Sequence, residues 1–243
     1  MQELSIEKIK KQFDILGDVE RNPIIAEYIP PKLQGRMITF RNDVIQNNFG
    51  RSLKAQKYFN YCNQYIAFFK SKSYQFLFKD YSIGRIIIEF DDDNKLVSYN
   101  MYWNPCPFNK AFIEELEEMD FDIAEYIDNL EPKEKLELDY LSLRTPLRFD
   151  FSSDYSGRNI EYHPLFHMHF QDSETRSHTD TFFSVYRYFL FILENCYPDI
   201  YGEKQYEEYV EQIRKLDKET KMWLKIKRDE RITGEKIHTM ISI

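Results

Sequence analysis

The chain has 243 residues and a net charge of −8, with 20 Phe and 18 Tyr but only 7 Gly. This length and composition favour a packed globular protein with a substantial core over a disordered one. Three widely spaced cysteines argue against a cysteine-based zinc site, and a charged N-terminus without long apolar runs predicts a cytoplasmic protein without a membrane span.

The first third of the chain is predicted to be mainly helical. Apolar residues recur at helical spacing over Ile6–Leu16, and the helix would end at Gly17. Residues 21–50 contain several prolines and predict an extended loop with at most one short strand. Helical spacing returns over Arg51–Lys70, and Tyr74–Phe78 is compatible with an extension of that helix or with a strand.

The centre of the chain carries the strongest hairpin signal. Two alternating segments, Arg85–Phe90 and Leu96–Trp103, flank a turn rich in Asp and Asn, which is typical of two antiparallel strands. The acidic stretch from Phe108 to Leu130 then has helical spacing.

A histidine cluster marks the candidate site. Four of the five histidines fall within sixteen residues: His163, His167, His169 and His178. Aromatic and Met residues alternate with histidine or leucine over Tyr162–Phe170, and a period of two is typical of a half-buried strand. The first three histidines would then share the face of the strand that points away from the core.

A second alternating segment, Leu147–Phe151, precedes the histidine strand and is separated from it by turn-forming residues. We expect the two segments to pair antiparallel. If their apolar faces meet one core, Arg148 and Asp150 lie on the histidine side. A carboxylate beside an imidazole can fix its tautomer or join it as a metal ligand.

Two further helices are predicted after the histidine strand. Thr179–Tyr197 is strongly apolar and predicts a buried helix, whereas Lys204–Arg231 is charged and amphipathic. The prediction is a single α+β domain with a mainly antiparallel sheet of about four or five strands flanked by helices. Residues 1–80 would form its N-terminal helical part, and residues 81–243 its sheet core and C-terminal helices.

Two interpretations of the histidine face are open. In the first, His167, His169, Asp150 and Arg148 are catalytic, and His163, His167 and His169 bind a divalent metal. In the second, the histidines only hydrogen-bond to neighbouring structure. Positions two residues apart on a strand are about 7 Å apart, so His167 and His169 could share one metal only with a twist or a bulge. The sequence contains no phosphate-binding glycine loop, dinucleotide motif, HExxH or nucleophile elbow, and predicts no cofactor-binding residue.

Charge is unevenly distributed along the chain. Glu114 to Asp139 carries twelve acidic side chains and two lysines, whereas Arg214 to Lys236 carries nine basic and five acidic ones. The acidic segment is compatible with docking to a partner protein, and the basic C-terminal region with binding nucleic acid. Either run can also be the solvated face of a helix.

The order of four segments resembles domain-of-unknown-function family 2290. These segments are Tyr99–Pro107, Leu147–Phe151, the His-Pro-Leu-Phe-His-Met-His strand at His163–His169, and a Phe-rich helix that ends at Asn195–Pro198. The similarity covers most of the chain from about residue 50. It implies a bacterial protein encoded beside a helicase in antiphage defence loci, and it assigns no catalytic role to any residue.

We therefore expect a cytoplasmic component of antiphage defence that acts with a partner helicase. Two alternatives remain: a metal-dependent hydrolase or nuclease that uses the histidine strand, and a non-catalytic adaptor that docks through its acidic segment.

Overall fold

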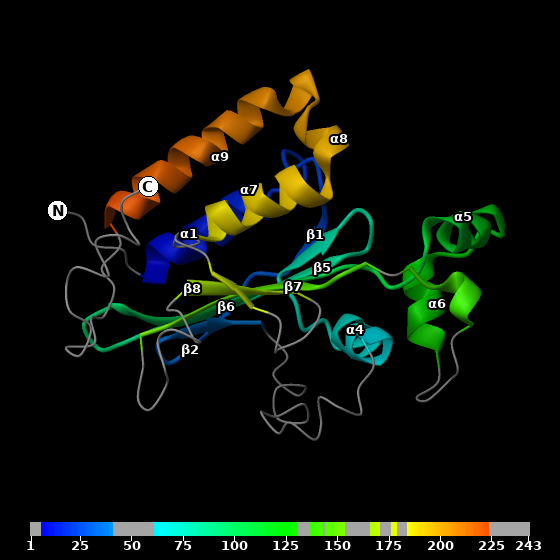
Figure 1. The fold of residues 1–243 in the computed structure, drawn as a ribbon, viewed down its shortest axis with the longest axis horizontal. Coiled ribbons are helices and arrows are strands. Elements are labelled where there is room, and N and C mark those ends of the chain that lie inside the picture. Colours follow the sequence, from blue (N-terminus) through cyan, green and yellow to red (C-terminus); the bar gives the residue numbers. More distant parts are fainter. Residues whose placement is uncertain are drawn as a thin grey trace.

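One antiparallel sheet runs through the molecule. The computed structural model describes residues 6–40, 61–130, 137–142, 144–153, 166–170, 176–178 and 184–223, and nine strands within them form this sheet (Figure 1). They are β1 (Ile25–Tyr28), β2 (Lys32–Gln34), β3 (Met37–Thr39), β4 (Phe76–Phe78), β5 (Ile83–Phe90), β6 (Leu96–Asn104), β7 (Leu147–Ser152), β8 (Phe166–Phe170) and β9 (Arg176–His178). The α+β prediction is confirmed, but the expected four or five strands are too few.

The strand order explains how the early part of the chain joins the sheet. The main path is β1-β4-β5-β6-β7-β8-β9, and β3 pairs with both β2 and β5. The part of the chain before residue 80, expected to be helical, thus also contributes four strands. Three of these, β1 to β3, have only three or four residues, too few to show a reliable period of two. The fourth, β4, shows that Phe76–Phe78 is a strand and not a helical extension.

The central strands pair as the sequence predicts. β5 and β6 form the expected hairpin, with Ile86 opposite Met101. β7 pairs antiparallel with β6 on one side and with β8 on the other, with Phe149 opposite both Met101 and Met168. The histidine strand is therefore a neighbour of the Leu147–Phe151 strand.

Helices cover the sheet unequally. α1 (Ile6–Leu16), α7 (Val185–Cys196) and α9 (Lys204–Trp223) lie on one side, α4 (Tyr61–Lys70) lies on the other, and α5 (Lys110–Glu118) and α6 (Ile123–Asn129) lie beyond one end (Figure 1). The short helix α8 (Pro198–Tyr201) connects α7 to α9, and a 3-10 turn spans Leu138–Tyr140. None of the helices among the described residues is long and apolar enough to cross a membrane.

The helix boundaries refine the predictions. α7 begins at Val185 because Ser184, in an extended conformation, caps it, with its side chain accepting a hydrogen bond from the Arg187 amide. The predicted helix is therefore not continuous through Ser184, and its residues 179–183 lie outside the described residues. The acidic stretch divides into α5 and α6, because Asp120 adopts a left-handed conformation with φ of 58° and Asp122 caps α6. Residues 51–60 and 224–231 of the other two predicted helices lie outside the described residues.

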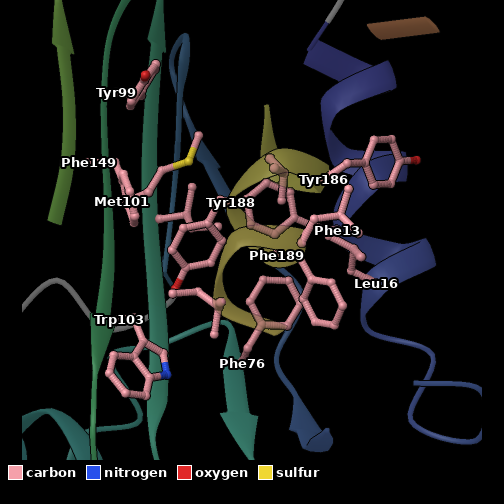
Figure 2. Close-up of a cluster of buried hydrophobic side chains, with 14 of the residues drawn as sticks. Phe13, Leu16, Phe76, Tyr99, Met101, Trp103, Phe149, Tyr186, Tyr188 and Phe189 are labelled. Atoms are coloured by element: carbon pink, nitrogen blue, oxygen red, sulfur yellow. The ribbon is translucent and has the colours of Figure 1, made fainter. Parts of the chain in front are cut away.

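The larger hydrophobic core lies between the sheet and the layer formed by α1, α7 and α9. Figure 2 shows side chains from β6 and β7 facing those of α7 and α1 across this space. The labelled residues are Phe13, Leu16, Phe76, Tyr99, Met101, Trp103, Phe149, Tyr186, Tyr188 and Phe189. The Tyr188 hydroxyl donates a 2.7 Å hydrogen bond to the Tyr102 carbonyl, so α7 is fixed to the sheet by polar contact as well as by burial of apolar surface.

A second core joins α4, α5 and α6 to the end of the sheet. Its buried members come from these helices and from the adjoining strands and loops: Tyr65, Phe68, Phe69, Tyr74, Leu77, Ile83, Cys106, Phe108, Phe112, Leu116, Ile123, Ile127 and Leu130. The two cores occupy different regions of the sheet. The face of β6, β7 and β8 that points away from the larger core therefore carries polar side chains.

Candidate functional site

Alternation along β7 and β8 sorts their side chains onto two faces. Phe149, Phe151, Phe166 and Met168 belong to the larger core. Asp150, His167 and His169 occupy the other parity and are also buried, each histidine being only 4% exposed. The predicted separation of an apolar and a histidine-bearing face is thus confirmed for residues 147–151 and 166–170. Residues 162–165, including His163, lie outside the described residues.

The register aligns the polar side chains in two rows across the strands. In one row, Asn100 on β6 is opposite Asp150 on β7, which is opposite His167 on β8. The adjacent row consists of Arg85, Tyr102, Arg148 and His169. The four residues predicted to be catalytic are therefore adjacent on one face of two neighbouring strands.

Asp150 is the centre of the cluster. Its Oδ2 lies 2.8 Å from Arg148 Nε, 3.1 Å from His169 Nε2 and 3.6 Å from His167 Nε2. Its Oδ1 accepts a 2.7 Å hydrogen bond from the Asn100 side-chain amide. Asn100 thereby holds the carboxylate so that the second oxygen faces the two imidazoles.

The surroundings of Asp150 favour its ionised form. Burial by itself raises the pKa of a carboxyl group, but contacts with His169, Arg148 and Asn100 outweigh it and hold the pKa of Asp150 below its ordinary value. Asp150 is therefore a carboxylate at neutral pH. A buried carboxylate in this state is an acceptor for protons, hydrogen bonds or a metal cation.

His169 is buried without the hydrogen bonds that such a group normally makes. Neither of its ring nitrogens has a hydrogen-bond partner among the described residues, although Nε2 lies within hydrogen-bonding distance of Asp150. We interpret the 3.1 Å contact between His169 Nε2 and Asp150 as an electrostatic approach. Burying a polar group without a partner is unfavourable, and such a group in a folded protein commonly marks a bound ion, water or ligand.

The two imidazoles are close enough to share one ligand. The His167 and His169 ring centroids are 4.7 Å apart, closer than the expected spacing of about 7 Å between alternate positions on a flat strand. One ligand atom from each of Asp150, His167 and His169 lies within 4.8 Å of the others. Tetrahedral centres with bonds of about 2.0–2.1 Å need ligand separations of about 3.3 Å. The two separations from Asp150 Oδ2 fit this value closely.

The donor set identifies the class of cation. Two imidazoles and one carboxylate suit Zn²⁺, Mn²⁺, Co²⁺ or Fe²⁺, and three protein ligands leave coordination positions for water or substrate. The neighbouring strand β9 places the backbone of His178 opposite His167 and that of Arg176 opposite His169. Both residues are thus in register with the site.

Sequence reasoning missed Asn100 and Tyr102. Both are on the polar parity of β6, where they alternate with the core residues Tyr99, Met101 and Trp103. That alternation was visible, but only the observed register of β6 with β7 assigns Asn100 to Asp150 and Tyr102 to Arg148.

Comparison with known proteins identifies the family. Residues 28–238 match the model of the family described as uncharacterized conserved protein DUF2290. Searches of the curated proteins and of the solved structures each found no match. Because the match extends over most of the chain and includes every residue of the site, the chain belongs to the DUF2290 family.

Proposed function

We propose that this DUF2290 protein is a metal-dependent hydrolase of phosphodiester bonds that acts with a partner helicase in bacterial antiphage defence. The convergence of Asp150 Oδ2, His167 Nε2 and His169 Nε2 at one buried point supports the hydrolytic activity. A purely structural network would be expected to satisfy the ring nitrogens of His169, and it does not do so among the described residues.

The site has the groups that phosphodiester hydrolysis requires. A divalent cation held by the three ligands would supply a Lewis acid and lower the pKa of a water molecule. Asn100 fixes the orientation of the Asp150 carboxylate, which keeps the ligand set in place. Arg148 brings a guanidinium, whose planar donors match the oxygens of a phosphate group, to the edge of the same site.

The defence setting is proposed from family membership. The resemblance to this family implies a bacterial protein encoded beside a helicase, and the chain belongs to the family. A helicase exposes nucleic acid strands, so a phosphodiester substrate is consistent with such a partner. The basic residues from Arg214 onward offer a region for nucleic acid contact, and a cytoplasmic location follows from the same setting.

An assay with defined metals tests the proposed activity. Chelator-treated protein is reloaded with Zn²⁺, Mn²⁺ or Mg²⁺ and incubated with single- and double-stranded DNA and RNA, with and without the helicase. We expect metal-dependent cleavage that His169→Ala abolishes and Ser98→Ala, a change on the same face of β6, preserves. Metal-loaded protein that cleaves none of these substrates contradicts the proposal.

The acidic surface of α5 and α6 favours a second candidate function, that of an adaptor. Eight acidic side chains in these helices and their junction are exposed: Glu114, Glu115, Glu117, Glu118, Asp120, Asp122, Glu125 and Asp128. Within the described ranges only Glu114 forms an ion pair, with Lys110. The exposed Met119 lies among them. An unpaired negative surface of this kind would steer a basic partner, and it is compatible with catalysis elsewhere in the chain.

A further inference from the structure

Arg148 and a metal ion would compete for the same oxygen. The Arg148 Nε atom lies 2.8 Å from Asp150 Oδ2, the oxygen that also faces both histidines. A cation bonded to that oxygen at about 2.0–2.2 Å would be adjacent to the guanidinium. The cation and the guanidinium would repel each other at that oxygen, because charge repulsion is strong where solvent screening is weak.

Arg148 is attached to Asp150 by an ion pair. Its Nε makes no directed hydrogen bond among the described residues, so the attachment to Asp150 is electrostatic. The Arg148 side chain is 26% exposed, against 11% for that of Asp150, and can move without unfolding its strand. Asn100 keeps the carboxylate in place when Arg148 leaves, because it bonds the other oxygen.

A second guanidinium, that of Arg85, belongs to the same row of the sheet as Arg148. Its guanidinium carbon lies 5.8 Å from the centre of the Tyr102 ring, and the buried Arg85 lies 5.6 Å from the same ring. Arg85 is fixed by the Ser73 carbonyl and has no ion pair within the described part of the chain. Arg148 has no second carboxylate partner there either. Once a cation neutralises Asp150, the Arg148 guanidinium therefore has no carboxylate partner among the described residues and is available to an anion.

We infer that Arg148 couples two ligands: a divalent cation displaces it from Asp150, and the released guanidinium then binds a phosphate group beside the cation. The inference rests on the proposed metal site and its proposed phosphodiester substrate, and it adds a role for Arg148 in binding that substrate. It also assigns the order of binding, because Arg148 is free for phosphate only after the metal has entered. Because the two binding equilibria are thermodynamically linked, the cation and the phosphate group must each strengthen the binding of the other.

Cobalt binding with and without a small phosphodiester tests the coupling. Co²⁺ is titrated into metal-free protein alone and at a fixed concentration of dimethyl phosphate, with visible absorption as the readout. For the wild type, dimethyl phosphate should raise the Co²⁺ affinity by about fivefold or more. Arg148→Gln removes the charge that competes for Asp150. In the absence of dimethyl phosphate this variant should bind Co²⁺ roughly tenfold more tightly than the wild type, since Co²⁺ no longer has to displace an ion pair of ordinary strength. The same variant should gain nothing from dimethyl phosphate.

Matched variants separate the possible failures. Arg21→Gln, an exposed change of the same charge near Asp18, should behave as the wild type. If Arg148→Gln does not fold, Arg148→Lys is tested in its place. Lysine keeps the positive charge but lacks the planar fork of donors that matches a phosphate group. Dimethyl phosphate must therefore raise the Co²⁺ affinity of Arg148→Lys by less than it raises that of the wild type. If Arg148→Gln binds Co²⁺ no more tightly than the wild type, or if dimethyl phosphate still raises its Co²⁺ affinity, the inference about Arg148 is overturned but the metal site is not. Absence of Co²⁺ binding by the wild type contradicts the metal site as well.

Discussion

Asp150 and His167 are direct cross-strand partners, yet the carboxylate lies closer to the imidazole of His169, at 3.1 Å against 3.6 Å. Both rings therefore lean toward one oxygen from positions two residues apart on β8. Sheet twist and rotamer choice allow this approach, which a flat strand would not. The result is one buried three-residue cluster in place of two independent polar positions.

Replacing the histidines separates a functional from a structural role. We expect His167→Ala and His169→Ala each to lower metal-dependent phosphodiesterase activity at least about a hundredfold, because each loses a metal ligand. Melting temperatures should stay within roughly 5 °C of the wild type, since both histidines lie on the polar face of the sheet and not in the larger hydrophobic core. Thermal denaturation and activity are measured on the same preparations. A variant that is active but strongly destabilised would indicate that its histidine is structural.

Asn100 is expected to act through Asp150. Asn100→Ala removes the amide that fixes Oδ1, so the carboxylate becomes free to rotate away from the histidines. Loss of such an orienting contact typically lowers metal affinity by about 10- to 100-fold. Ser98→Ala, two residues earlier on the same face of β6, is the control and should leave Co²⁺ affinity unchanged. Equal affinities for the two variants would remove Asn100 from the site.

Charge reversal tests the acidic surface as a docking site. Glu117→Lys with Glu118→Lys should weaken binding to the helicase partner, and the loss should be greater at low than at high salt because screening weakens charge pairing. Glu207→Lys with Glu208→Lys makes the same charge change on exposed positions of α9 and should have little effect. Binding is measured at two ionic strengths. Indistinguishable losses for the two pairs would point to a general effect of net charge.

Two thiols, the buried Cys106 and the half-buried Cys196, should resist modification in the folded protein. Burial raises the pKa of Cys106 to about 12 and that of Cys196 to about 11, so both remain protonated at pH 8. Because the thiolate is the reactive form, a disulfide reagent should label them slowly in native protein and quickly in denaturant. Because the pKa values are raised only in the folded protein, the unfolded chain loses these two protons at a lower pH than the folded chain does. The free energy of unfolding should therefore decrease as pH rises above about 9. Rapid labelling of native Cys106 would contradict its burial.

The two strands that carry the site residues were predictable because their alternation of apolar and polar residues extends over five or more positions. Leu147–Phe151 and the histidine strand each alternate between apolar and polar residues, and the core accepts only the apolar set. This constraint by itself places Arg148, Asp150, His167 and His169 on one face of the sheet. The close approach of the two imidazoles was not predictable, because it depends on strand twist and on rotamers.

The remaining strands were missed for a different reason. β1, β2, β3 and β9 have three or four residues each, and their pairing depends on distant partners such as the β3–β5 contact. Local sequence contains little information about such tertiary contacts. Asn100 was missed because its role depends on register: a shift of one residue between β6 and β7 would have placed another side chain opposite Asp150.

Cobalt titration of the wild type and of Asp150→Asn tests the central claim most directly. The substitution keeps the shape of the side chain and removes the negative oxygen that faces both histidines. We predict that chelator-treated wild-type protein binds one Co²⁺ per chain with visible absorption bands typical of a low-coordinate site containing histidine, and that Asp150→Asn loses these bands while remaining folded. Absence of the bands in the wild type, or their persistence in Asp150→Asn, would contradict a metal centre built on Asp150, His167 and His169.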